Sequence, residues 1–218
     1  MSNVRFRYQT IELGETDYHL RTLRDAQQCP DDLVDTSGLG VSSATWPLFG
    51  VLWQSEELLS ELMLTQEIDG LRILEVGCGT ALASIVLQRR GADITASDFN
   101  PDAQAYLTAN TELNELAPIR CVCSNWNETD VHLGRFDLII GSDLLYDHHN
   151  VAPLVTFLET HANPRCTIVI VDPRRGLTGP FIRRVEGLGF SAQVDQVTYP
   201  LDVDAAEQFL VMRFNRAA

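Results

Sequence analysis

Two glycines and two carboxylates between residues 71 and 100 have the types and spacing of a site for a nucleotide-like ligand. A short apolar run ends in Glu75, Gly77 and Gly79, and a second apolar run ends at Asp98, 21 positions after Gly77. Glycines let the backbone approach a ligand without an intervening Cβ. A carboxylate at about this interval can accept both hydrogens of a ribose diol. The pattern predicts a site for an adenosine-containing molecule.

The charge beside this turn favours a cationic ligand over a dinucleotide. A dinucleotide fingerprint reads G-x-G-x-x-G, because the pyrophosphate sits on amides at the helix start. Leu82 occupies the third glycine position, and Glu75 would place a negative charge near that phosphate. Carboxylates attract cations, and S-adenosylmethionine carries a sulfonium and an ammonium but no phosphate. We therefore expect S-adenosylmethionine as the ligand. The alternatives are NAD and a turn that binds no ligand.

The elements that must position these residues alternate between strands and helices. Strands are expected at 71–76, 92–97, 119–124, 136–142 and 165–171, and helices at 50–64, 80–90, 101–116, 149–161 and 178–187. Such alternation predicts a parallel sheet with right-handed crossovers. The strands are nearly continuous apolar runs, so helices should cover both faces of the sheet.

The C-terminal part breaks this alternation. Segments 189–199 and 207–215 both have strand character, and the link between them is too short for a crossover helix. The two strands must therefore be antiparallel, which matches the methyltransferase fold better than a dinucleotide-binding fold. The expected fold class is α/β, a three-layer Rossmann-like seven-stranded methyltransferase sheet, mostly parallel with an antiparallel C-terminal strand. Residues 1–45 are expected to be an N-terminal extension with a short hairpin, and residues 46–218 the methyltransferase domain.

Composition limits the partners of the chain. The 218 residues carry a net charge of −14, and the basic residues are scattered. Nucleic acid is disfavoured because it requires clustered Lys and Arg. A basic or lysine-bearing protein would be steered toward an acidic surface, although acidity also serves solubility alone. No apolar run is long enough for a membrane span, and the N-terminus lacks a signal-peptide core, so we expect a cytoplasmic protein. Composition leaves the oligomeric state open.

Polar residues also follow the third and fourth expected strands, where an open sheet binds its ligands. Asn125 and Trp126 follow segment 119–124, and Ser142, Asp143 and Tyr146 follow segment 136–142. Asn125 can hydrogen-bond an adenine edge and Trp126 can pack on an adenine face. A tryptophan at this place is equally compatible with a core plug.

The full set of motifs resembles the DxxY-signature lysine methyltransferases, called methyltransferase family 16. The motifs are EVGCGT, SDFN, NW and SDLLY, together with Trp53-Gln54-Ser55, which is similar to the upstream tryptophan motif of that family. SSATWPLFGVLW and VDPRR are similar to its bacterial branch. The resemblance covers about residues 40 to 215.

The resemblance implies a role for each site residue. Glu75, Gly77 and Gly79 would line the methionine part of the cofactor, Asp98 would bind the ribose, Asn125 and Trp126 would contact the adenine, Trp53 would cover the cofactor, and Ser142 would also bind it. Asp143 and Tyr146 would be the catalytic residues between cofactor and substrate. The chain has Ala81 and Ser84 where many members have glycine, and Asn125 where an acid is common.

The implied activity is an S-adenosylmethionine-dependent N-methyltransferase that modifies a protein lysine and releases S-adenosylhomocysteine. A small-molecule methyltransferase and a cofactor-binding module without turnover are the alternatives. Asp143 would guide an incoming ammonium by charge. We expect no metal site, because the adjacent His148 and His149 would point in different directions on a helix. Arg174 and Arg175 are expected on a solvated loop, with a position facing the substrate as the alternative.

Overall fold

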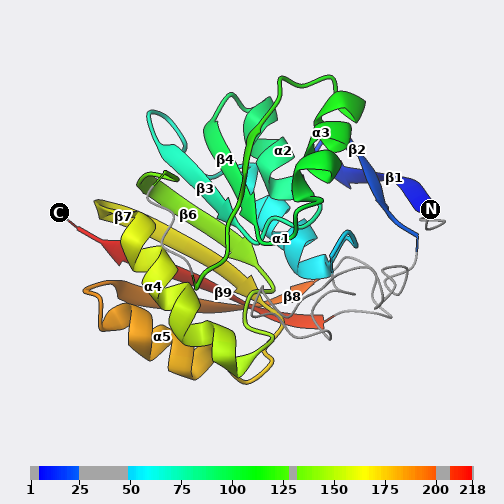
Figure 1. Ribbon diagram of the computed structural model, residues 1–218. Helices are drawn as coiled ribbons and strands as arrows, with labels where there is room; N and C mark the ends of the chain where they lie inside the picture. The colour runs from blue at the N-terminus through cyan, green and yellow to red at the C-terminus, as the bar shows by residue number, and fades with distance from the viewer. Residues whose placement is uncertain (1–4, 25–48, 128–131, 200–206, 218) are drawn as a thin grey trace.

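The protein forms a seven-stranded sheet with helices on both faces and a separate N-terminal hairpin (Figure 1). The structure is a computed structural model that describes residues 5–24, 49–127, 132–199 and 207–217. The strands of the large sheet are β3 (Arg72–Val76), β4 (Asp93–Asp98), β5 (Arg120–Cys123), β6 (Phe136–Ser142), β7 (Ala162–Asp172), β8 (Ser191–Tyr199) and β9 (Glu207–Arg216). The helices are α1 (Gln54–Met63), α2 (Leu82–Arg89), α3 (Ala103–Leu113), α4 (Val151–His161), α5 (Thr178–Glu186) and the short 3-10 helix η3 (His148–Asn150). The hairpin consists of β1 (Phe6–Leu13) and β2 (Thr16–Leu23).

The strand order places a ligand crevice beside β3. The order is β5-β4-β3-β6-β7-β9-β8, so the direction of winding reverses between β3 and β6. Val76 at the end of β3 pairs with Ser97 of β4 on one side and with Gly141 of β6 on the other. The loops after β3 and β6 therefore diverge, and ligands of open α/β sheets bind at such a switch point.

The core consists of two apolar layers, one on each face of the sheet. Alternate residues of a strand point to opposite faces, so Leu138 and Ile140 of β6 pack with the cluster under α1, α2 and α3. Ile139 between them packs with the cluster under α4 and α5. All three side chains are fully buried. This arrangement confirms the predicted three-layer α/β fold and explains why the strands lack polar alternation.

The C-terminal strands confirm the predicted antiparallel pair. Strand β9 pairs antiparallel with β8 and inserts between β8 and β7, with which it is also antiparallel. Among the seven strands of the described sheet, β9 is thus the one that is antiparallel to the other six.

The N-terminal hairpin packs on α3. Strand β2 forms hydrogen bonds with two asparagines, one within α3 and one at the C-terminal end of that helix. Arg21 N–H donates to Asn110 Oδ1 at 2.7 Å, and Asn114 accepts from His19 N–H at 3.0 Å and donates to His19 O at 2.7 Å. The predicted hairpin is present, whereas the expected boundary at residue 45 lies outside the described residues.

Helices α1 to α4 begin two to four residues later than the sequence suggests, and in α2 and α3 turns occupy the expected first residues. Ala81 has a left-handed φ of 63°, so α2 starts at Leu82. Asn100 Oδ1 accepts the Asp102 N–H at 2.9 Å, which holds Pro101 in a turn before α3. Among the described residues, we find no helix with the length and apolar character that crossing a membrane requires.

Candidate functional site

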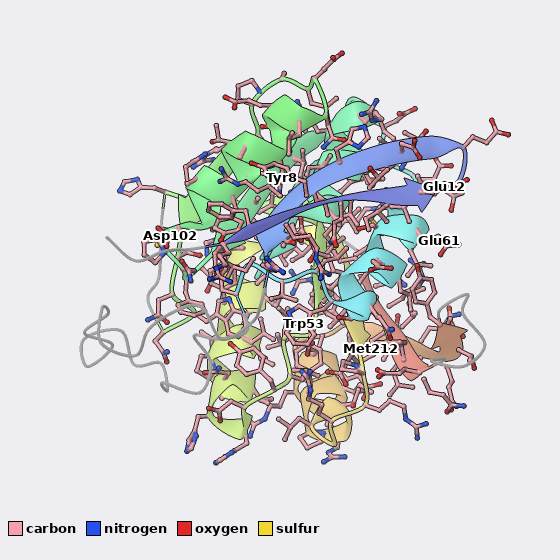
Figure 2. All side chains as sticks on the ribbon, turned by 90° about the vertical axis from the view of Figure 1, so that its right-hand side faces the viewer. Tyr8, Glu12, Trp53, Glu61, Asp102 and Met212 are labelled. Atoms are coloured by element: carbon pink, nitrogen blue, oxygen red, sulfur yellow. The ribbon has the colours of Figure 1, made fainter. Side chains whose placement is uncertain are left out.

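A cavity opens at the carboxyl ends of β3, β4 and β6. It holds about 720 Å³ of space, part of which is open solvent. Eight of the ten residues expected in the site line it: Trp53, Gly77, Gly79, Asp98, Trp126, Ser142, Asp143 and Tyr146. Figure 2 shows Trp53 on the face that also carries α1 and the hairpin. The fold therefore brings together residues that are up to 93 positions apart in the chain.

The glycine turn after β3 lines the cavity and has no room for a side chain at residue 77. Gly77 has a φ of 64°, a conformation that L side chains rarely adopt, and a Cβ built on it would lie 2.6 Å from Leu144 Cδ2. The Cys78 N–H donates to Ser97 O at 3.0 Å and ties the turn to β4. Leu144 thus fills the space that a side chain at residue 77 would need.

We expect Gly77→Ala to lower the free energy of unfolding by about 2 to 4 kcal/mol, the sum of left-handed strain and overpacking against Leu144. Gly70→Ala is the matched control, because Gly70 has a similar φ of 71° but no atom within 4 Å of the position that a Cβ would take. Urea unfolding of both variants separates strain from crowding. A double-mutant cycle with Leu144→Ala should show favourable coupling for Gly77→Ala. Equal losses for the two glycine variants would contradict the crowding by Leu144.

Three buried carboxylates from different elements hold the turn and the start of α2. Asp98 Oδ2 at the end of β4 accepts the Gly79 N–H at 2.9 Å. Glu56 of α1 accepts the Leu82 N–H at 2.7 Å and the Thr80 hydroxyl at 2.9 Å. Glu75 of β3 accepts the N–H of Ser84 at 2.9 Å and also its hydroxyl. The N–H groups at a helix start lack partners within the helix, and here carboxylates supply them.

Burial of these carboxylates disfavours their charged forms. Desolvation raises the pKa of Glu75 to about 7, and the negative charge of Asp98 contributes to the rise. The pKa of Glu56 lies well above its usual value because of burial and the charge of Glu75. Burial likewise raises the pKa of Asp98. A cation bound in the cavity would stabilise all three carboxylates in their ionised forms.

Two expected site residues do not line the cavity. Glu75 is 1% exposed and directs its carboxylate to Ser84, so it acts on the cavity through charge and through the position of α2. The Asn125 amide oxygen accepts the backbone N–H of Asn127 at 3.0 Å and its side-chain amide at 3.1 Å. Glu75 and Asn125 are therefore not among the described residues that line the cavity, and their expected contacts with a ligand stay predictions.

Glu56 is the charged residue of the described cavity wall that the sequence reasoning missed. Its side chain is 4% exposed and lines the cavity beside Gly79. A signal was available, because Glu56 shares a helix face with Leu59 and Met63 at spacings of three and seven residues. Both the leucine and the methionine are fully buried. A carboxylate on an otherwise apolar face requires partners, which marks it as a candidate.

The DxxY residues also line the cavity, in the loop after β6. Asp143 has a φ of 54°, and its carboxylate forms an ion pair with Arg175, in which the Nη2–Oδ2 distance is 3.0 Å. Arg175 was expected on a solvated loop. It lies on an exposed loop after β7, and its guanidinium nevertheless reaches Asp143 on the cavity wall. Burial and nearby negative charges raise the pKa of Tyr146 to about 12, so its phenol stays neutral.

The two adjacent histidines converge, contrary to the argument from helical spacing. Their ring centroids are 3.8 Å apart, and the Nδ1 atoms of His148 and His149 lie 3.5 and 3.1 Å from Asp147 Oδ1. The segment is a 3-10 turn capped by Asp147, which changes the side-chain directions. Both imidazoles are largely exposed, and an exposed cluster of this kind does not establish a metal site.

Comparisons with known proteins agree with this geometry. Residues 34–187 match the protein family described as lysine methyltransferase. The electron transfer flavoprotein beta subunit lysine methyltransferase of Danio rerio is 33% identical over 135 residues, which cover 59% of this chain and 51% of that protein. Protein N-lysine methyltransferase METTL21A of Danio rerio is 32% identical over 146 residues, 64% of each chain. The chain spans about half to two thirds of the length of these relatives.

A solved structure extends the similarity of fold over nearly the whole chain. The 16S rRNA N2 G1207 methyltransferase RsmC of T. thermophilus, in complex with AdoMet and guanosine, superposes with a TM-score of 0.65. The sequences are 18% identical, and the match covers 97% of this chain and 51% of that chain. At this identity the likeness establishes the fold alone. Because the family match spans well over half of the sequence, the chain belongs to the lysine methyltransferase family.

Proposed function

We propose that the protein is an S-adenosylmethionine-dependent methyltransferase that methylates a lysine side chain of a protein and releases S-adenosylhomocysteine. The observation that carries the proposal is a cavity at the switch point of the sheet whose charged described residues are all acidic: Glu56, Asp98 and Asp143. Such a wall suits a sulfonium compound and opposes a diphosphate. Membership of the lysine methyltransferase family supports the same cofactor and acceptor.

The residues of the cavity fit the parts of this cofactor. Asp98, at the end of β4, would accept the ribose hydroxyls. Gly77 and Gly79 leave room for the methionine part, with Glu56 next to them. Trp126 offers an aromatic face for the adenine, and Trp53 lies at the start of α1 as a cover. Glu75 contributes negative charge from behind the turn.

The acceptor lysine must react as a free amine. When bound, the cofactor supplies an electrophilic methyl group: a nitrogen–carbon bond forms, the carbon–sulfur bond breaks, and the electron pair stays on sulfur. The methylated amine then releases one proton to water. The pKa of an exposed lysine is about 10.4, and desolvation lowers it. The apolar residues Phe49, Val51 and Leu144 of the cavity wall supply that desolvation.

We expect Asp143→Ala to keep its affinity for S-adenosylmethionine and to lose methyl transfer by about 100-fold, because an acceptor out of alignment reacts far more slowly. Isothermal titration measures the affinity, and incorporation of radiolabelled methyl groups into a proteome extract measures transfer. Asp147→Ala is the matched control, since Asp147 is four residues away but does not line the cavity.

The same assay separates the candidate functions. A labelled protein band supports a protein methyltransferase, and label in small molecules alone supports a small-molecule methyltransferase. Cofactor binding without any label supports a binding module. Wild-type transfer by Asp143→Ala would remove Asp143 from the reaction.

A further inference from the structure

The loop after β7 is built to hold Arg175 in one position. Asp172 at the end of β7 is fully buried, and its Oδ1 accepts the Arg174 N–H at 2.8 Å. Arg174 adopts a left-handed φ of 63°. A non-glycine residue in this conformation is strained and persists only where its surroundings impose it. The buried carboxylate of Asp172 thus fixes the turn that presents Arg175.

The partner of Arg175 is held equally firmly. Asp143 also has a left-handed φ, and its N–H donates to Val171 O of β7 at 2.9 Å. Arg175 donates from both terminal nitrogens to both carboxylate oxygens of Asp143. Such a bidentate pair is specific for the planar guanidinium. The Asp143 side chain is 14% exposed, whereas that of Arg175 is 37% exposed. Asp143 is therefore largely covered and already paired.

This pairing changes the charge in the acceptor site, the part of the cavity around Asp143 and Tyr146 where the substrate lysine would bind. A free Asp143 carboxylate would bind a lysine as its ammonium and keep it protonated, and an ammonium has no lone pair for attack on the methyl group. The other charged groups near this region, among the described residues, include Glu56 and Asp98 on the cavity wall, Asp147 beside Tyr146, Asp172 in the turn before Arg175, and Glu207 of β9, which acts on Arg175 by charge. The phenol of Tyr146 is neutral.

We propose that Arg175 is a positioning residue of the acceptor site, which holds Asp143 neutralised so that the site takes the acceptor lysine as a free amine. Asp143 then accepts a hydrogen bond from the amine and directs its lone pair, while the guanidinium opposes reprotonation. This inference rests on the proposed protein-lysine methyltransferase function and replaces the expectation that Asp143 attracts an ammonium.

The test is the pH dependence of methyl transfer in Arg175→Met. The acceptor probe is the extract protein that the wild-type protein labels, at saturating S-adenosylmethionine. Without the guanidinium, the rising limb of the rate should move up by about 1 to 2 pH units. Transfer should therefore fall about 10-fold or more at about pH 7.5 and recover near about pH 10. Arg175→Lys should give an intermediate profile, because it keeps the charge and loses the bidentate geometry.

Arg174→Met is the matched control from the same turn. The Arg174 side chain donates to Gln208 Oε1 at 3.0 Å, and neither residue lines the cavity, so its profile should equal that of the wild type. The double variant Arg175→Met with Asp143→Asn removes the unpaired charge as well. Its rising limb should return to the wild-type pH, although the total rate stays low.

The possible outcomes test the role of Arg175 and the proposed function separately. A profile of Arg175→Met that superimposes on the wild-type profile, or a loss of rate that is uniform at all pH values, overturns the role of Arg175. No labelled protein with the wild-type enzyme overturns the proposed function and this inference with it. Titration with S-adenosylmethionine verifies that each variant is folded, and Arg175→Gln replaces Arg175→Met if the latter fails this check.

Discussion

Replacing Asp98 with Asn is expected to lower the affinity for S-adenosylmethionine by about 100-fold or more. Asp98 Oδ1 accepts the Asn100 N–H and Oδ2 accepts the Gly79 N–H, each at 2.9 Å. An asparagine has one amide oxygen for these two N–H donors, so its NH₂ group would face the second donor. Hydrogen bonds to a charged group contribute about 1.5 to 3 kcal/mol each, so losing the ionised acceptor for a ribose diol accounts for this factor.

The measurement is isothermal titration at about pH 8, well above the pKa of an ordinary aspartate. Asp102→Asn is the control: it makes the same change of charge four residues later, on an exposed side chain before α3 (Figure 2). Asp102→Asn should bind like the wild type. A comparison of S-adenosylhomocysteine with NAD by thermal shift belongs to the same series. Stabilisation by NAD alone, or unchanged affinity of Asp98→Asn, would contradict the proposed cofactor.

The turn between β3 and β4 was predictable because its determinants are local in the sequence. The apolar runs, Gly77, Gly79 and Asp98 lie within 30 residues, and a βαβ unit brings them together with a fixed hand. The same holds for the C-terminal pair, where a short link permits only an antiparallel connection. The fold class and most of the cavity wall follow from such local features.

The rest of the site depends on contacts between distant segments, which one sequence does not reveal. Glu56 reaches α2 because α1 packs against that helix, and this contact joins residues 26 positions apart. Arg175 meets Asp143 over 32 positions because two left-handed residues turn their loops toward each other. The sequence reasoning expected Asp143 in the site, and it lies on the cavity wall, but its pairing with Arg175 was not foreseen.

The second large effect is expected at Glu75, where Glu75→Gln should stabilise the protein in the absence of cofactor and weaken cofactor binding. The folded-state pKa of Glu75 is raised from 4.5 to about 7, so folding favours the protonated form. The stability that this group contributes is present below about pH 4.5 and is lost as the pH rises through about 7. The shift corresponds to about 3 kcal/mol.

Glutamine is neutral at every pH and keeps the hydrogen bonds to Ser84, because its one amide oxygen can accept both the N–H and the hydroxyl, which share Glu75 Oε2 in the wild type. We therefore expect Glu75→Gln to raise the free energy of unfolding at about pH 8 by about 1 to 3 kcal/mol relative to the wild type. At about pH 5 the two proteins should be nearly equal. Urea unfolding at both pH values measures the difference, with Glu61→Gln on the exposed face of α1 as the control (Figure 2).

Cofactor binding should change in the opposite direction. In the wild type, affinity for S-adenosylmethionine should rise between about pH 6 and 8 as Glu75 ionises, because an ionised carboxylate behind the turn attracts the cation. In Glu75→Gln this rise should be smaller and the affinity at about pH 8 about 10-fold lower. The preference for S-adenosylmethionine over S-adenosylhomocysteine, whose sulfur is uncharged, should also decrease. A variant that is less stable than the wild type at this pH would show that the ionised carboxylate supports α2 through Ser84. A more stable variant with weaker binding would show that the fold retains a buried acid, at a cost in stability, for the charge it presents to a cation.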